Sequence, residues 1–373
     1  MIDCQRFYGA MTERGIGFYA GVPDSLLANF CAYVDDHGGR DRHLITANEG
    51  NAVAPAMGYH MATGKVAAVY MQNSGLGNTV NPLTSLADPA VYKVPMLLVV
   101  GWRGEPGFKD EPQHVKQGQV TIDQLQVLGV PHWVLDADSN VEEVLDAAFA
   151  KMKETNAPVA LVVRKDTFAK YKSKSGGPAV SDMGREEALG RLLGLCDARD
   201  LIVSTTGKTS REVFELRNKR GEKQRDFLTV GGMGHTSSIA LGVAIGQPDR
   251  RVVCLDGDGS LLMHMGAMPV VAQYQPKKFV HVLLNNGAHE SVGGQATASA
   301  TIDYEKLAGA VGYTGYAVAS DLEGIAVAWK KLEGASGPVL LEVRIKCGSR
   351  DDLGRPTSTA EQNKQAFMES VRG

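Results

Sequence analysis

The chain has 373 residues with a formal net charge of −3, and 43% of them are hydrophobic, 22% are charged and 43 are glycine. This composition excludes a disordered or fibrous chain, and the length predicts about two domains, each with its own core. The near-neutral charge argues against a nucleic-acid partner, and the apolar runs are only as long as strands, which argues against a membrane span. Five scattered cysteines without Cys-x-x-Cys spacing favour a reducing, cytoplasmic location over a disulfide framework.

Along the chain, short β-branched runs alternate with helix-length segments, which is typical of a parallel sheet covered by helices. In the first half the predicted strands are 17–20, 43–47, 66–71, 96–101, 133–135 and 159–164. In the second half they are 201–204, 227–230, 251–255, 279–284, 315–318 and 339–344. We therefore predict an α/β protein with two similar, doubly wound parallel sheets of about six strands each.

A polar segment with Gly-Gly-Pro at its centre lies between the halves and is interpreted as a linker. We place the first domain at 1–170, the linker at 171–184 and the second domain at 185–373. A helix is predicted at 185–195, with Ser181 or Asp182 as its N-cap. The closing strands of the two halves have similar sequences, Pro-Val-Ala-Leu-Val-Val-Arg and Pro-Val-Leu-Leu-Glu-Val-Arg, which suggests two copies of one architecture.

The strongest chemical pattern follows the strand at 251–255. That strand leads to Gly257, Asp258, Gly259 and Ser260, and the next strand leads to Asn286. A carboxylate and an amide oxygen are ligands that Mg²⁺ accepts, and a helix opening at Ser260, together with glycine amides, would hold a diphosphate. Gly-Asp-Gly alone would be read as an ordinary turn, but its pairing with Asn-Asn on the next strand favours the functional interpretation.

Gly-Asp-Gly followed by Asn-Asn resembles the motif of the thiamine-diphosphate-dependent enzymes. The resemblance implies that Asp258, Asn286 and the main-chain carbonyl of Ala288 bind the Mg²⁺ that carries the cofactor's diphosphate. Alanine stands at 288 where the family usually has glycine, a change that a backbone ligand tolerates. The resemblance also implies a pyrimidine-binding first domain and a diphosphate-binding second domain, with no room for the middle domain of many relatives.

The family needs a glutamate near a strand end of the pyrimidine-binding domain, and Glu49 matches it. Its carboxylate would hydrogen-bond the cofactor's pyrimidine ring and favour the tautomer that deprotonates the reactive carbon; a glutamate at a helix start is the alternative. The turn at 73–78 resembles the pyrimidine-side turn, whose implied cofactor contacts are Ser74, Gly75 and Asn78.

Two further segments match cofactor contacts in the second domain. Met233, next to Gly232, would bend the cofactor from below, although methionine often simply fills a core. Thr206, Gly207 and Lys208 would contact the diphosphate. The same segment looks like the end of a P-loop but has Ile202 where that loop needs glycine, and an exposed lysine is the remaining alternative for Lys208.

Within the family, the size and the local sequences resemble the phosphonopyruvate and sulfopyruvate decarboxylases, and those of the phosphonopyruvate branch most. The segments that carry this resemblance are 21–25, 73–78, 101–104, 110–118, 205–210 and 285–294. They imply non-oxidative decarboxylation of 3-phosphonopyruvate to phosphonoacetaldehyde and CO₂, in phosphonate biosynthesis, by a homo-oligomer of at least two subunits with shared active sites.

A basic loop fits such a substrate, because a phosphonate brings up to two negative charges. Arg103, Lys109 and Lys116 are the expected substrate-binding cations, and the resemblance adds His114 as an active-site histidine. Asp24 and His114 are expected to carry the proton steps. Ordinary solvated charges remain the alternative for Lys109 and Lys116.

Four other functions stay open from the sequence. Sulfopyruvate decarboxylation is the same chemistry on a sulfonate, and carboligation would join the decarboxylated substrate to an aldehyde. A nucleotide-dependent phosphotransferase would use Gly207-Lys208-Thr209. A catalytically inactive cofactor-binding protein is disfavoured by the presence of Glu49.

Overall fold

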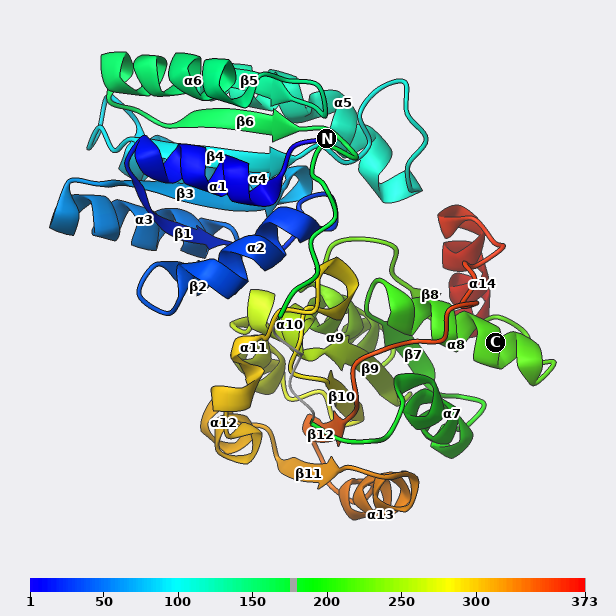
Figure 1. Ribbon diagram of the computed structural model, residues 1–373. Coiled ribbons are helices and arrows are strands. Elements are labelled where there is room, and N and C mark those ends of the chain that lie inside the picture. The colour runs from blue at the N-terminus through cyan, green and yellow to red at the C-terminus, as the bar shows by residue number, and fades with distance from the viewer. Residues whose placement is uncertain (175–179, 373) are drawn as a thin grey trace. The chain divides into compact units, whose positions relative to one another are not determined.

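All twelve predicted strands are present in the computed structural model, which describes residues 1–174 and 180–372 (Figure 1). The first six are β1 Ile16–Gly21, β2 His43–Ile45, β3 Val66–Gln72, β4 Met96–Gly101, β5 His132–Leu135 and β6 Val159–Val163. The second six are β7 Leu201–Ser204, β8 Phe227–Leu228, β9 Val252–Gly257, β10 Phe279–Asn285, β11 Gly315–Ala319 and β12 Val339–Arg344. The chain divides into two compact units, 1–176 and 177–373, each with one sheet.

The two sheets have the same topology, which confirms the predicted pair of doubly wound sheets. The orders are β2-β1-β3-β4-β6-β5 and, read from the other edge, β8-β7-β9-β10-β12-β11, and every neighbouring pair is parallel. In each sheet the chain changes direction of winding between its first and third strands. Ligands of such sheets bind beyond the carboxyl ends of the strands at that switch.

Helices cover both faces of each sheet, which is why the central strands are apolar throughout: all residues of β4 and β6 are buried. In the first unit, one face packs against α1 Cys4–Glu13, α2 Ala28–Gly38 and α6 Val141–Thr155. The opposite face packs against α3 Gly50–Thr63, α4 Leu76–Pro82 and α5 Pro112–Val127.

The second unit repeats this layering. One face of its sheet packs against α7 Arg185–Leu195, α8 Lys208–Lys219 and α13 Leu322–Leu332. The other face packs against α9 Thr236–Gly246, α10 Asp258–Met263, α11 Ala267–Tyr274, α12 Tyr304–Val311 and α14 Ala360–Arg372.

Two details of the predicted helices are wrong, the N-cap of one helix and the first residue of another. The helix at 185–195 has the predicted bounds, but its N-cap is Gly184, whose N–H donates to the Glu187 carboxylate, whereas the Ser181 hydroxyl donates to the Ser320 carbonyl. The helix after β9 begins at Asp258 rather than at Ser260. In both cases a glycine without a capping side chain precedes the first turn, so the sequence offered no ordinary cap to locate it.

The start of the predicted linker is attached to the first unit. The Tyr171 hydroxyl and the Lys174 backbone N–H both donate to the carboxylate of Asp36 on α2, at 2.9 and 2.8 Å. The Gly-Gly-Pro centre of the linker falls in residues 175–179, which lie outside the described residues. None of the helices described in the two ranges is long and apolar enough to cross a membrane, and all five cysteines are free thiols.

A buried ion pair in the second unit gives a stability prediction. Asp226 accepts two hydrogen bonds from Arg217, at 2.7 and 3.0 Å, and the two side chains are 1% and 2% exposed. Asp226→Ala leaves a buried guanidinium short of partners, so we expect it to lower the free energy of unfolding by about 3–5 kcal/mol in urea denaturation. The exposed pair Lys151–Glu154 is the control: Glu154→Ala should cost less than about 1 kcal/mol, and an equal cost of the two variants would contradict this account.

Candidate active site

Glu49 is buried at the N-terminus of α3, where its carboxylate points at the turn after β3. The side chain is 5% exposed, and its Oε2 accepts a hydrogen bond of 2.7 Å from the amide of Asn78. A Cβ atom on Gly75 would overlap the Glu49 carboxyl group, whereas a Cβ on Gly77 would meet nothing within 4 Å. The structure therefore brings Glu49, Gly75 and Asn78 together, and Gly75 is the glycine that makes room for the carboxylate.

Asp24 lies just beyond β1 and is fully buried, with its carboxylate against Gly101 at the end of β4. Burial raises the pKa of Asp24 to about 6, although the positive charge of Arg103 opposes this. One oxygen, Oδ2, accepts the backbone N–H groups of Leu26 and Leu27 at 3.0 and 3.3 Å. The other oxygen, Oδ1, is buried and has no hydrogen-bond partner in the described part of the chain. An acidic group in this state is suited to exchanging a proton near neutral pH.

The loop between β4 and α5 is organised by Asp110, which the sequence analysis did not single out. Asp110 accepts two hydrogen bonds from Arg103, at 2.8 and 2.5 Å, and one of 3.0 Å from Nδ1 of His114. Arg103 also donates to the Ser25 hydroxyl at 2.7 Å, next to Asp24. Arg103 and His114 thus bind the same carboxylate. This role of Asp110 is visible only in the folded structure.

The two predicted lysines of this loop make no comparable contacts. Lys109 and Lys116 are exposed, and neither forms a hydrogen bond or ion pair with the residues described. Solvated lysines at a loop surface can move toward a ligand, but they do not shape the loop.

In the second unit, the turn after β9 and the end of β10 bring Asp258 and Asn286 together, as predicted. Asp258 is 3% exposed; burial raises its pKa to about 6, although a 2.5 Å hydrogen bond from Thr297 and the backbone amide of Asn286 oppose this. The side-chain oxygen of Asn286 accepts the backbone N–H of Ala288 at 3.0 Å. Ala288 pairs with Ala296 in an isolated antiparallel β-bridge, in which the Gly287 carbonyl accepts the N–H of Thr297. The Ala288 carbonyl is not used in this bridge.

This oxygen-rich corner fits a divalent cation. A buried carboxylate whose ionisation is disfavoured, an oriented amide oxygen and a nearby backbone carbonyl form a ligand set that Mg²⁺ accepts, and a cation would offset the cost of the buried charge. Asn285, the other asparagine of the pair, differs in role: its side chain bonds Glu342 and Ser299 within the core.

Ser260 joins three of the predicted segments. Its hydroxyl lies 3.2 Å from the Thr205 hydroxyl and accepts the N–H of Gly234 at 3.1 Å, and the side chain is buried. Met233 packs toward this turn, since a Cβ on Gly259 would lie 3.2 Å from its Cε. The segments around Thr206, Met233 and Ser260 therefore form one cluster at the carboxyl ends of β7 and β9, and the Ser260 hydroxyl links them.

Lys208 is not a free surface lysine. It begins α8, after Gly207 with φ +87°, and its Nζ donates to Glu290 at 2.8 Å. Glu290 also bonds Arg185 at 2.9 Å and the amide of Asn286 at 3.0 Å. Hydrogen bonds and the charges of Arg185 and Lys208 hold the pKa of Glu290 below its usual range despite burial. The sequence could not reveal Glu290, because its partners are far away along the chain.

His289 is a third residue, after Asp110 and Glu290, that the sequence did not predict as part of the site. Its ring is 8% exposed and lies close to Gly259, where a Cβ would be 3.3 Å from Nδ1. Burial lowers the pKa of His289 to about 4, so the ring is neutral at pH 7. A neutral imidazole therefore faces the same turn as Met233.

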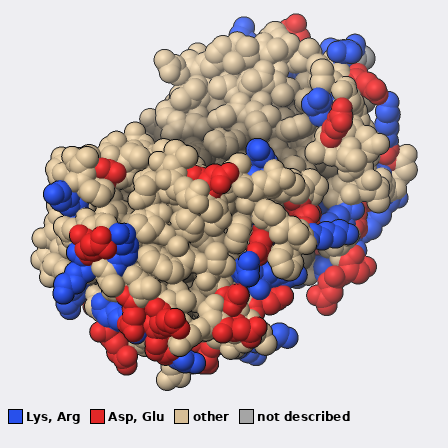
Figure 2. Space-filling view, turned by 90° about the horizontal axis from the view of Figure 1, so that it is seen from above, with Lys and Arg blue, Asp and Glu red and all other residues tan. Residues whose placement is uncertain are grey.

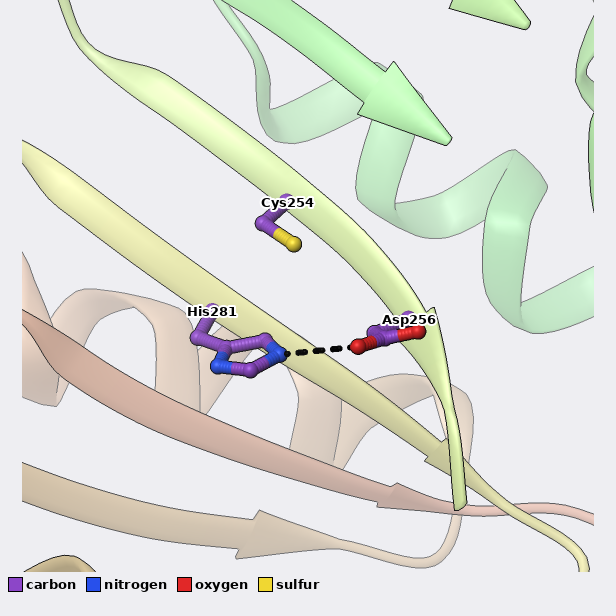
Figure 3. A group of neighbouring side chains, drawn as sticks. All are labelled: Cys254, Asp256 and His281. Carbon is purple, nitrogen blue, oxygen red and sulfur yellow. Dashed lines mark hydrogen bonds and ion pairs between the residues drawn. The ribbon is translucent and has the colours of Figure 1, made fainter. Parts of the chain in front are cut away.

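Cys254, Asp256 and His281 form a buried group on β9 and β10 whose polar atoms lie within 4.8 Å of one another (Figure 3). The groups are already satisfied without a metal: His281 bonds the Tyr313 hydroxyl at 3.0 Å and Asp256 at 3.4 Å, and Asp256 also accepts the N–H of Gly257. Burial raises the pKa of the Cys254 thiol well above its usual range. The group supports the start of the Gly257 turn.

Two models of one enzyme family match this chain. Residues 5–127 match the family model "Thiamine pyrophosphate enzyme, N-terminal TPP binding domain", and residues 206–343 match the corresponding C-terminal TPP binding domain. The chain belongs to the thiamine-diphosphate-dependent enzymes. The C-terminal match includes Gly207-Lys208-Thr209, so the phosphotransferase interpretation of that segment has no support.

Three similar members of this family are decarboxylases matched over nearly their full length. A phosphonopyruvate decarboxylase of Streptomyces viridochromogenes is 36% identical over 390 aligned residues, covering 100% of this chain and 95% of the relative. A phosphonopyruvate decarboxylase of Streptomyces hygroscopicus is 35% identical, covering 99% and 94%. A sulfopyruvate decarboxylase of Methanosarcina acetivorans is 26% identical, covering 97% and 95%.

Charged side chains of both signs lie on the surface of the protein. On the face drawn in Figure 2, Lys and Arg side chains lie among Asp and Glu side chains, and no broad patch of positive charge is seen there.

The buried Asp24 carboxyl predicts a pH effect that does not depend on the reaction. Its pKa in the folded chain, about 6, lies above the usual 3.8, so folding favours the protonated form and stability from this group is lost as pH rises from about 4 to 6. Asp24→Asn removes the charge. Its free energy of unfolding relative to wild type should therefore rise by roughly 2 kcal/mol between pH 4 and pH 7.

Urea denaturation at both pH values measures this difference. The exposed Asp123 on α5 provides the matched control, because Asp123→Asn removes a solvated charge. A difference for Asp24→Asn that does not change with pH would contradict the placement of Asp24 as a buried acid.

Proposed function

We propose that the protein decarboxylates 3-phosphonopyruvate to phosphonoacetaldehyde and CO₂, using thiamine diphosphate and Mg²⁺. The observation that most supports this is the similarity to a phosphonopyruvate decarboxylase, which is 36% identical in an alignment that covers 100% of this chain. In the net reaction the bond between the carboxylate and the carbonyl carbon breaks, and CO₂ leaves. The carbonyl carbon takes up one proton in its place.

Residues of the second unit would hold the diphosphate and its metal. We assign Asp258, Asn286 and the carbonyl of Ala288 to Mg²⁺, and the diphosphate to backbone amides around Gly257 and Gly259 and to the residues Thr206, Gly207 and Lys208. The Ser260 hydroxyl holds this cluster together, so we assign it a supporting contact. Lys208 would share its charge between Glu290 and the diphosphate.

Residues of the first unit would orient the cofactor ring. We assign Glu49 to the pyrimidine, held in place by Asn78 and given room by Gly75, with Ser74 in the same turn. Met233, beside Gly232 in the second unit, would support the cofactor's bent shape. When bound, thiamine diphosphate supplies an electron sink for the pair left by the departing CO₂.

The loop after β4 supports recognition of a phosphonate. Three of the five N–H groups of Arg103 donate to Asp110 and Ser25, so two remain for an anionic substrate. We assign these N–H groups, together with Lys109 and Lys116, to the phosphonate. Charge-assisted hydrogen bonds from a fixed guanidinium give direction, and exposed lysines add charge.

Asp24 and His114 are assigned to the proton steps. The pKa of Asp24, about 6, allows both protonation states near neutral pH, and its Oδ1 is free of hydrogen bonds within the described residues. His114 is held at one ring nitrogen by Asp110. We further propose a cytoplasmic enzyme, in line with five free thiols, that assembles as at least a dimer with shared active sites.

Sulfopyruvate decarboxylation is the second candidate, favoured by the relative that matches 97% of this chain. Comparing kcat/KM for phosphonopyruvate and sulfopyruvate in one enzyme preparation, with added aldehyde to detect carboligation, tests the proposal. We expect phosphonopyruvate to be preferred and phosphonoacetaldehyde to be the product. Preference for sulfopyruvate, or a ligated product, would overturn it.

Gly75 and Gly77 provide a matched test of the Glu49 site. Gly75→Ala puts a methyl group where the Glu49 carboxyl lies, while Gly77→Ala meets open space. We expect Gly75→Ala to reduce kcat by about 10²-fold, close to the effect of Glu49→Gln, and Gly77→Ala to leave kcat within about twofold. Steady-state CO₂ release measures both; equal activity of the two glycine variants would count against this role of Glu49.

The metal assignment predicts a binding defect. Asp258→Ala removes the charged ligand, so Mg²⁺ should no longer increase the affinity for thiamine diphosphate, as measured by isothermal titration calorimetry with and without the metal. Asp256→Asn, two residues earlier, changes a carboxylate that faces His281 instead and should retain the Mg²⁺ effect. An unchanged Mg²⁺ effect in Asp258→Ala would refute the assignment.

A further inference from the structure

Asp110 gathers five hydrogen bonds on one carboxylate at the base of the basic loop. Besides Arg103 and His114, the donors are the backbone N–H groups of Gly104 and Glu111, both at 2.7 Å. The carboxylate therefore ties the segment that follows β4 to the first turn of α5. All of its acceptor positions face donors, so nothing in this arrangement requires it to contact substrate.

The bond to His114 defines which ring nitrogen carries a proton. Although burial alone would raise it, hydrogen bonds from Arg103 and His114 hold the pKa of Asp110 well below its usual range. An ionised carboxylate only accepts hydrogen bonds, so Nδ1 of His114, 3.0 Å from Oδ1, must be the donor. A neutral ring then has its lone pair on Nε2.

The ring orientation is also supported from the backbone. A Cβ on Gly104, which has φ +68°, would overlap the His114 carbonyl, and a Cβ on Gly118 would overlap the carbonyl of Gly104. The loop and α5 thus pack backbone against backbone, and His114 has little freedom to leave Asp110. Its side chain remains 12% exposed, and Nε2 has no hydrogen-bond partner among the residues described.

We propose that Asp110 is a positioning residue that holds His114 as the Nδ1–H tautomer, so that Nε2 is the ring nitrogen available for proton exchange with the substrate. This inference rests on the proposed function, in which His114 carries a proton step. Asp110 acts through His114 and does not touch the reacting atoms.

Through Arg103, the Asp110 carboxylate is also connected to Asp24, the other residue proposed to carry a proton. Arg103 uses two N–H groups on Asp110 and a third on Ser25, the neighbour of Asp24. Its charge opposes the burial that raises the pKa of Asp24. Asp110 therefore fixes the cation that lies beside Asp24 as well as the tautomer of His114.

NMR of ¹⁵N-histidine-labelled protein tests the proposal directly. At pH 8, long-range ¹H–¹⁵N spectra distinguish the two tautomers, and loss of one set of signals in His114→Gln assigns the residue. We expect wild-type His114 to be Nδ1–H and Asp110→Asn to lose that preference, with Asp123→Asn unchanged as the matched control. An Nε2–H ring in the wild type overturns the proposal, even if Asp110→Asn does not fold.

Kinetics provide the second readout. We expect Asp110→Asn to lower kcat by about 10²-fold. In a His114→Gln background the same change should lower kcat little further, because both substitutions remove the same function. Losses that multiply would show a separate structural role and overturn the proposal. If the wild type has the Nδ1–H tautomer but does not decarboxylate phosphonopyruvate, the proposed function fails and the positioning of His114 by Asp110 stands.

Discussion

The parallel arrangement of the strands is the constraint on which the rest of the structure depends. In a parallel sheet all carboxyl ends meet at one edge, so a residue that follows one strand lies near residues that follow its neighbours. Asp24 follows β1, Glu49 follows β2, and Asp258 follows β9. Because the second sheet repeats the strand order of the first, the chain presents two such edges, each with its own set of polar side chains.

The buried and partly buried carboxylates at these edges are of two kinds. Asp24 and Asp258 have pKa values raised by burial to about 6, which marks groups whose charge is not fully balanced within the chain. Asp110 and Glu290 have lowered pKa values despite partial burial, because hydrogen bonds from Arg103 and His114 stabilise the Asp110 carboxylate and the charges and hydrogen bonds of Arg185 and Lys208 stabilise that of Glu290. The first kind is suited to a proton or a metal ion, and the second kind fixes the positions of its neighbours.

The sequence predicted every strand, because strands buried on both faces are apolar runs with polar ends. It also predicted the proximity of Asp258 and Asn286, since both follow adjacent strands. It could not predict Asp110 or Glu290. An aspartate in a polar loop looks like any solvated charge, and the partners of Glu290 include Arg185, more than a hundred residues away. The N-cap of the helix at 185–195 and the first residue of the helix after β9 were predicted wrongly, because a glycine without a capping side chain precedes each helix.

The proposed function, decarboxylation of a phosphonate-bearing 2-oxo acid, requires both thiamine diphosphate and Mg²⁺. The most direct measurement is CO₂ release from phosphonopyruvate by protein stripped of cofactor and metal, then supplied with thiamine diphosphate, Mg²⁺ or both. We expect sustained turnover only when both are present, with one phosphonoacetaldehyde formed for each CO₂. No turnover with both present, or equal turnover without thiamine diphosphate, would contradict the proposed function.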